Sequence, residues 1–179
     1  MTSNFNLSTR RFAFSAAVAF GCALSFNAVA AIDTDSIAVS ASVVSSCTIT
    51  ADPLAFGVYD PNSVVDVEIN GAVTALCTLD TAGYITLGQG LTAIGDVPGA
   101  PVRQMAGGAA AAGRLGYFLY SDPALATAWG NTGATGLNHV GTGEAVIIPV
   151  YGQIVAGQNV IAGAAGTAYA DTVVATITF

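Results

Sequence analysis

Hydrophobic and polar residues alternate with a period of two along most of the chain after residue 30. The last segment, 171–179, places Val173, Ala175, Ile177 and Phe179 on one face, opposite Val174 and three threonines. Such alternation indicates half-buried β-strands. With breaks at Gly, Pro, Asn and Asp, it predicts strands over 36–44, 47–51, 64–78, 83–90, 114–121, 144–155 and 171–179. Many short strands separated by turn residues are typical of a sandwich or barrel, so we expect an all-β fold.

Two glycine-rich stretches interrupt this pattern. Residues 105–113 carry a run of alanines, but their three glycines favour a loop over a helix. Residues 129–143 hold five glycines and two asparagines, which predicts a long mobile connection. Around these loops, the phase of the strands predicts that four side chains face the core: Tyr117, Leu119, Ile147 and Val173.

Residues 1–30 have the three-part composition of a secretory signal peptide. Two arginines precede an apolar run at 12–26, and small residues lead up to an expected cleavage after Ala30. A membrane anchor is the first alternative, but the run is shorter than the roughly 20 residues that a spanning helix needs. Lipoprotein processing at Cys22 is the second. The residues before Cys22 suit it poorly and an apolar stretch continues beyond it, so we assign Cys22 to the signal peptide.

The remaining residues 31–179 suffice for one domain with a sizeable core. They contain two arginines, no lysine and all eleven acids, a net charge of 2 − 11 = −9. An acidic chain has no electrostatic attraction for nucleic acid or for an anionic membrane. We therefore expect neither as a partner, and no membrane span in the mature form.

Cys47 and Cys77 are the two cysteines that remain after cleavage. An even pair in an exported protein predicts a disulfide, which the chain-entropy model values at roughly 3–4 kcal/mol for this loop. A metal site is the alternative, but two thiols without a nearby histidine make a poor one.

No residue pattern indicates catalysis. His139 is the only histidine, and its glycine-rich surroundings predict a solvated loop residue. The sequence contains no GxSxG motif, and no second histidine is present for a triad or a zinc site. We therefore predict that the protein is not an enzyme and has no catalytic residue, bound metal or cofactor.

Three other groups of residues have a functional interpretation and a structural one, and the structural one is favoured in each case. Carboxylates near residues 60–68 could act in acid–base chemistry or bind calcium, but turns and strand surfaces commonly carry them: Asp60, Asp66 and Glu68. Aromatic side chains could form a sugar-stacking platform, but strand aromatics usually belong to the core: Tyr117, Tyr120 and Trp129. Arg103 and Arg114 are expected to pair with acids rather than to bind a ligand.

The segment before Cys47 is amphipathic at the period of a strand. One face is apolar, with Ile37, Val39, Ala41 and Val43, and the other is small and polar, with Ala38, Ser40 and Ser42. Such a segment can pair within its own sheet, or it can be a free arm that completes the sheet of another subunit. The final strand raises the matching question, because a strand with one free side can recruit another chain.

The order and spacing of several motifs resemble the spore coat protein U family, which includes the shaft pilins of archaic chaperone–usher pili. The resemblance covers essentially all of residues 31–179. Its motifs are LAFGVYDP (54–61), ALCT (75–78), YITLGQG (84–90), RQM (103–105), LGYFLYSDPALATAWG (115–130), VYGQI (150–154) and YADTVVATITF (169–179).

The resemblance implies an incomplete immunoglobulin-like sandwich that lacks its last strand, over residues 45–179. The edge of the resulting groove would be formed by Val173, Ala175, Ile177 and Phe179. A periplasmic pilus chaperone would first lend a strand to this groove, and the arm of another subunit would then replace it. That arm would be residues 31–44, with Ile37, Val39, Ala41 and Val43 as the side chains that enter the groove.

The function implied is that of a structural subunit of an adhesive surface pilus. Its partners would be the chaperone, an outer-membrane usher and other copies or paralogous pilins joined head to tail. The protein would be exported through the periplasm to the cell surface. A lectin-like or tip adhesin domain, or a component of a spore coat, is the alternative.

Overall fold

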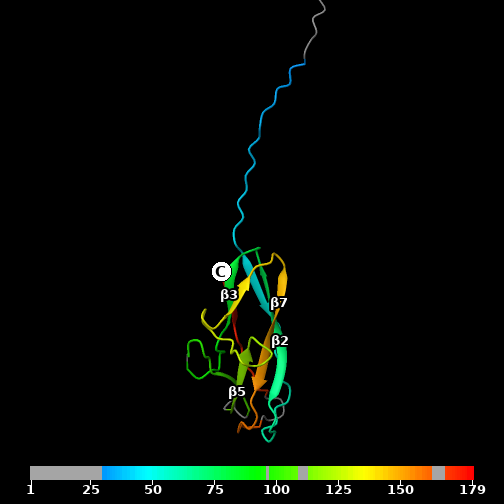
Figure 1. Ribbon diagram of the computed structural model, residues 1–179. Helices are drawn as coiled ribbons and strands as arrows, with labels where there is room; N and C mark the ends of the chain where they lie inside the picture. Colours follow the sequence, from blue (N-terminus) through cyan, green and yellow to red (C-terminus); the bar gives the residue numbers. More distant parts are fainter. Residues whose placement is uncertain (1–29, 96, 109–112, 163–167) are drawn as a thin grey trace, which may run out of the picture. The chain divides into compact units, whose positions relative to one another are not determined.

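The computed structural model describes residues 30–95, 97–108, 113–162 and 168–179. The chain divides into two units, Met1–Ala41 and Ser42–Phe179. In the first unit, residues 30–41 form neither helix nor strand, and all but residue 30 of the predicted signal peptide lies outside the described residues. The second unit consists of strands and connections, without a helix among its described residues (Figure 1). No described segment forms an apolar helix of membrane-spanning length.

The strands form two antiparallel sheets, which confirms the predicted all-β, two-sheet architecture. The larger sheet has the order β1-β2-β7-β5-β4 and the smaller one the order β6-β3-β8. The bounds are β1 Cys47–Ala51, β2 Val67–Cys77, β3 Ala82–Leu87, β4 Arg103–Gly107, β5 Gly113–Tyr120, β6 Leu137–Val140, β7 Ala145–Ile154 and β8 Ala175–Thr178.

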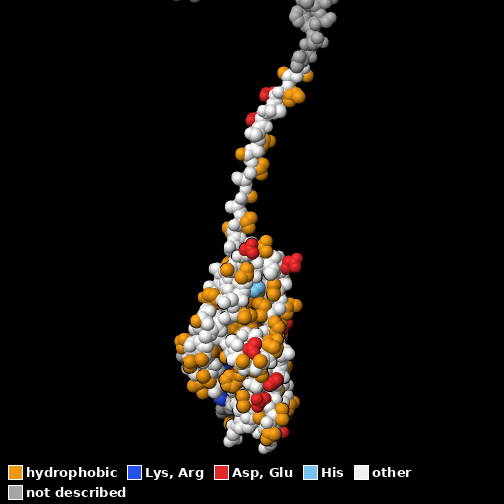
Figure 2. Space-filling view, in the orientation of Figure 1, with side chains coloured by type: hydrophobic (Ala, Val, Ile, Leu, Met, Phe, Trp, Pro, Cys, Tyr) orange, Lys and Arg blue, Asp and Glu red, His pale blue; other side chains and the backbone are white. Residues whose placement is uncertain are grey.

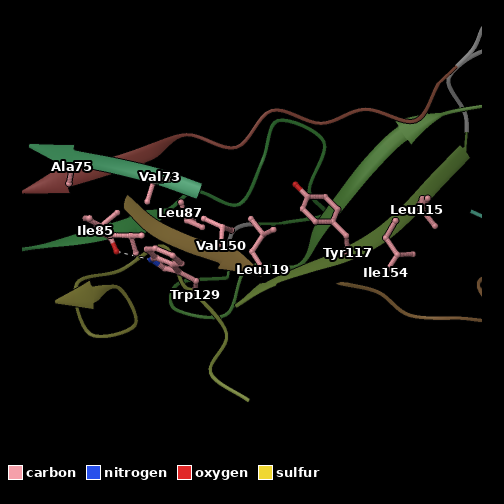
Figure 3. Packing of buried hydrophobic residues seen from close by; sticks show 11 residues of the cluster. Val73, Ala75, Ile85, Leu87, Leu115, Tyr117, Leu119, Trp129, Val150 and Ile154 are labelled. Carbon is pink, nitrogen blue, oxygen red and sulfur yellow. Dashed lines mark hydrogen bonds between the residues drawn. The ribbon is translucent and has the colours of Figure 1, made fainter. Parts of the chain in front are cut away.

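The core lies between the two sheets as an elongated row of side chains (Figure 3). The β2–β7 ladder, from Val67↔Ile154 to Leu76↔Ala145, supplies its longest stretch. Trp129 is fully buried, and its indole N–H donates to the carbonyl of Ile85 at 2.8 Å. The other buried members are Val73, Ala75, Ile85, Leu87, Leu115, Tyr117, Leu119, Ile148, Val150 and Ile154.

Two strands occur where the sequence predicted loops. β4 includes Gly107, which pairs with Gly113 of β5, and Tyr169 packs against both glycines. A Cβ atom at Gly107 would lie 2.7 Å from Cα of Tyr169. These glycines therefore reflect close packing within a hairpin rather than a loop. β6 lies within the expected mobile connection and pairs with β3; residues 109–112 of the other stretch lie outside the described residues.

Other predictions differ from the structure in extent or phase. Residues 36–44 form no strand, and only 175–178 of the last segment joins a ladder of more than one residue pair. Ile147 was predicted to face the core, but it is 72% exposed, whereas Ile148 is 9% exposed. Adjacent isoleucines fit either phase of β7. Val150, Gly152 and Ile154 settle the phase, because all three are buried on the side of Ile148.

Candidate functional site

β1 and β8 are edge strands of different sheets that begin or end at the same end of the domain. β1 pairs only with β2, and β8 only with β3, among the described strands. Cys47 lies opposite Cys77 and Thr178 opposite Tyr84. Because four residues separate Cys77 from the start of β3, the start of β1 and the end of β8 share one end (Figure 1). The two edge strands therefore run in opposite directions, each with one free side.

A cleft of about 960 Å³ extends from these edges along the domain, and we call it the groove. One wall is the segment that follows β1, residues 51–61, and the other is the segment that leads into β8, residues 168–175. The floor consists of core side chains of the larger sheet: Val73, Leu115, Tyr117, Leu119, Val150 and Ile154. An apolar floor between two such walls can accommodate an extended polypeptide with alternating apolar side chains.

The first wall is fixed by its own side chains. Leu54 lies against Gly71 of β2 and Gly152 of β7, where a Cβ atom would come within 2.6 Å and 2.7 Å of its methyl carbons. The rings of Phe56 and Tyr117 follow, with centroids 6.0 Å apart. At the far end, the Tyr59 hydroxyl accepts a hydrogen bond from the backbone N–H of Gln158 at 2.8 Å. The wall thus lies on the inner face of the larger sheet, although its residues after Ala51 belong to no strand.

The second wall keeps the alternation seen in the sequence. Val173, Ala175 and Ile177 are partly buried against the core, while Thr172 and Val174 are exposed. Of the predicted groove-edge residues, Val173 and Ala175 line the groove, whereas Ile177 and Phe179 do not. Phe179 is 55% exposed beyond the end of β8. The role of all four as an edge for an incoming strand stays a prediction.

A polar cluster underlies the groove. Arg103 is 3% exposed and donates hydrogen bonds to the carbonyls of Leu87, Gly88 and Trp129. Burial lowers the pKa of Arg103 to about 10, while Tyr117 and Asp171 oppose this change. Burial also raises the pKa of Tyr117, assisted by its hydrogen bond to Asp171. The predicted pairing of Arg103 with an acid therefore takes another form, in which carbonyls accept its hydrogen bonds and Asp171 acts through its charge.

The predicted donor side chains lie in the N-terminal segment, which forms no strand at residues 30–46. Ile37, Val39 and Val43 are 90%, 89% and 85% exposed, and Ala41 is also exposed. Figure 2 shows hydrophobic side chains spaced along this extended segment. Most of the apolar surface of these side chains is therefore in contact with water, and burying it would be favourable. Their role as a donor strand stays a prediction. The predicted disulfide is present: Cys47 and Cys77 are bonded and lie opposite each other at the first position of β1.

The remaining sequence candidates have structural surroundings. Trp129 is fully buried, which removes it from any sugar-binding platform. His139 lies in β6 and is partly buried, which corrects the expectation of a solvated loop residue. Asp66 accepts hydrogen bonds from Gln153 and from the N–H of Ala156, and Asp60 caps its own turn. Within the described residues, His, Cys, Asp and Glu form no group of three or more that could hold a metal ion.

The groove-edge residues predicted from the sequence all lie in or after the second wall, and no prediction concerned the first wall. The motif LAFGVYDP (54–61) has a hydrophobic pattern that matches neither a strand nor a helix. The signal that could have identified it is the pair Gly71 and Gly152. Both lie at inward positions of predicted strands, where the absence of a side chain requires another residue to fill the space.

Comparisons with known proteins agree with this architecture. Residues 33–176 match the model of the Spore Coat Protein U domain, and the chain belongs to this family. The chain is also 43% identical over 162 residues to "Protein U" of Myxococcus xanthus, which covers 85% of this chain and 88% of that protein.

A solved structure is similar in fold. It is a chain of the CsuC–CsuE chaperone–tip adhesion subunit pre-assembly complex, from archaic chaperone-usher Csu pili of Acinetobacter baumannii. The TM-score is 0.53 at 19% identity, and the match covers 76% of this chain. It covers 40% of that chain, so the present protein spans less than half of its length. At this identity the likeness concerns the fold alone.

Proposed function

We propose that the mature chain, residues 31–179, is a structural subunit of a surface fibre of the chaperone–usher type, in which the N-terminal arm of one copy fills the groove of the next. The observation that carries this proposal is the groove itself, an apolar floor flanked by the segment that follows β1 and the segment that leads into β8, two strands that each have one free edge. The arm is residues 31–44, and residues 45–179 form the domain that receives it.

The arm has the chemistry that the groove requires. Its backbone would pair with the free edges, while Ile37, Val39, Ala41 and Val43 would point to the floor. Ser40 and Ser42 would then face solvent. Because β1 and β8 run in opposite directions, an inserted strand is parallel to one edge and antiparallel to the other.

Insertion requires the groove to widen. Some Cα atoms of β1 and β8 lie within 8 Å of each other. A strand between two neighbours needs roughly 9–10 Å from one neighbour to the other. The edges therefore separate by an ångström or more when the arm enters. A chaperone strand that occupies the groove before assembly would hold it at this width.

The contact joins different surfaces of two copies, so it does not close into a ring and instead extends as a filament. The partners are a periplasmic chaperone, an outer-membrane usher and other copies or paralogous subunits. The family and the Csu pilus chain of similar fold support these partners. The same assignment places the protein in the periplasm during export and then at the cell surface. The proposed function is assembly into a fibre and not catalysis.

A spore coat is a second possible location for the same assembly, favoured by the family and by the 43% identity to Protein U. Neighbouring genes and antibody labelling distinguish the two locations. Adjacent genes for a chaperone and an outer-membrane usher support the fibre. Antibody labelling confined to the spore surface supports the coat.

The test of the proposed function is assembly with and without the arm. The full chain, produced with its chaperone and usher, is expected to give a ladder of heat-stable polymers on a denaturing gel. A chain without residues 31–44 but with its signal peptide is expected to reach the periplasm in complex with the chaperone and to remain monomeric. Heat-stable ladders from the chain without the arm would overturn the proposal.

A further inference from the structure

Asp171 lies where the C-terminal segment changes from one sheet to the other. Before it, Ala170 pairs with Ala106 of β4, in the larger sheet. After it, Ala175 pairs with Leu87 of β3, in the smaller sheet. Between these pairs, the segment forms one backbone hydrogen bond with other described residues, from the Gly88 N–H to the Val174 carbonyl at 2.8 Å. Side-chain contacts must therefore hold the wall of the groove at this crossing.

The Asp171 carboxylate makes those contacts. Its Oδ1 accepts hydrogen bonds from the N–H groups of Leu91, Thr92 and Thr172 at 2.9, 3.2 and 2.8 Å. Its Oδ2 accepts one from the Tyr117 hydroxyl at 2.7 Å. In Figure 3 this hydroxyl points from β5 toward the C-terminal segment. Four donors satisfy the carboxylate within the domain, so it requires no external ligand.

The surroundings are fitted closely to this carboxylate. Gly90 has a φ of +92°, and a Cβ atom there would lie 1.9 Å from Asp171 Oδ2. Arg103, buried beneath the groove, adds a favourable charge. The loop after β3 and the Tyr117 side chain from β5 therefore both bind the Asp171 carboxylate on the wall of the groove.

We propose that Asp171 is a positioning residue that holds the C-terminal wall of the groove at the width and angle needed for an incoming strand. The proposal rests on the proposed function. Asp171 acts through Val173 and β8, which follow it, and it need not contact the arm. Without it, the segment between Ala170 and Ala175 would keep the Gly88–Val174 hydrogen bond and the packing of Val173, and it would be held less firmly to the larger sheet.

Hydrogen exchange on the mature full-length chain tests the effect on the wall. Asp171→Ala is expected to accelerate exchange of the amides of 172–176 at least tenfold, while the amides of the β2–β7 ladder remain unchanged. Asp171→Asn keeps the Oδ1 acceptor and is expected to have a smaller effect, as is Tyr117→Phe. The matched control is Asp122→Ala, which also removes a carboxylate bonded to three backbone N–H groups but lies outside the groove lining.

If Asp171→Ala does not fold, Asp171→Asn and Tyr117→Phe still test the proposal. Equal acceleration in the wall and in the β2–β7 ladder, or no acceleration in any variant, would show that Asp171 has no specific role at the wall. Because this measurement needs no polymer, its outcome is independent of the proposed function.

Assembly supplies the second measurement. Fibres of the full chain with Asp171→Asn are expected to dissociate into monomers at least tenfold faster in hot detergent than fibres with Asp122→Asn. Equal rates would contradict the role of Asp171 in holding the strand. If the unsubstituted chain formed no fibre at all, the proposed function would fail, and hydrogen exchange would still decide whether Asp171 positions the wall.

Discussion

The side chain of Leu54 occupies the space that a side chain at Gly152 would otherwise fill, with Cδ2 only 2.7 Å from the position of a Cβ atom there. Phe56 Cζ lies 2.8 Å from the same position. Gly152→Val is therefore expected to displace both and to destabilise the domain by about 1–3 kcal/mol, the usual cost of overpacking. Urea unfolding of the mature chain measures the change.

The matched control is Ala145→Val, which adds volume at an exposed position of the same strand. It should change stability by less than about 0.5 kcal/mol. If Gly152→Val were equally neutral, the segment after β1 would not be held against the larger sheet as described.

This contact shows which features the sequence could predict. The strand at 114–121 and the final strand at 175–178 could be predicted because their alternation is a local property. Residues 36–44 and 171–174 alternate in the same way but form no strand, so alternation alone does not decide whether a segment pairs. The place of residues 54–59 depends on Gly152, almost a hundred positions away, and no local pattern encodes such a contact. β4 could not be predicted for the same reason. Gly107 leaves room for Tyr169, which lies far along the chain.

Ile147 and Ile148 are adjacent but face opposite sides of β7. Ile148→Ala should cost about 2–5 kcal/mol, because it removes buried side-chain volume and leaves a cavity. Ile147→Ala should cost less than about 1 kcal/mol, because its side chain is 72% exposed. Thermal or urea unfolding of both variants checks the phase of the strand. A larger loss from Ile147→Ala would reverse the faces.

The Cys47–Cys77 bond joins the start of β1, a groove-bordering strand, to the end of β2. Replacing both residues by Ser should lower stability by roughly 3–4 kcal/mol, since the unfolded chain regains the freedom of the closed loop. The yield of periplasmic subunit should fall accordingly. Mass spectrometry of the non-reduced mature protein should find no free thiol at either position, and alkylation of both would contradict the disulfide.

Tyr117 should make stability fall at alkaline pH. Burial raises its pKa, so the folded chain keeps a proton that the unfolded chain loses near pH 10. Its contribution is complete below about pH 10 and declines as the pH rises beyond that value. Arg103 acts in the opposite direction between about pH 10 and 12.5, where the unfolded chain binds the proton more tightly.

The comparison of Tyr117→Phe with the unsubstituted chain isolates the tyrosine, because Arg103 is common to both. Between pH 8 and 11 (about the range around a tyrosine pKa), the free energy of unfolding should fall more steeply for the unsubstituted chain. Tyr151→Phe, on the other face of the larger sheet, controls for the loss of a hydroxyl. Parallel curves for all three chains would show that Tyr117 is ionised as readily in the folded as in the unfolded state.

The faces of the arm provide the sharpest prediction, because adjacent residues should have opposite effects. Val39→Asp would place a carboxylate on the apolar floor of the groove without a partner, at a cost of several kcal/mol. It should abolish heat-stable polymers while leaving the complex with the chaperone intact. Ser40→Asp adds the same charge at the next position, where the side chain would face solvent in the inserted arm, and should preserve most of the polymer.

The complementary change is to add a copy of residues 31–44 after Phe179 through a short flexible linker. The copy should fill the groove within the same molecule and yield a stable monomer that needs no chaperone, because the groove edges then find their partner in cis. Val39→Asp within the added copy should reverse this effect, and the corresponding Ser40→Asp should not. Equal polymer yields from Val39→Asp and Ser40→Asp in the native arm would mean that the arm does not insert its apolar face into the groove. The groove between β1 and β8 would then need another occupant.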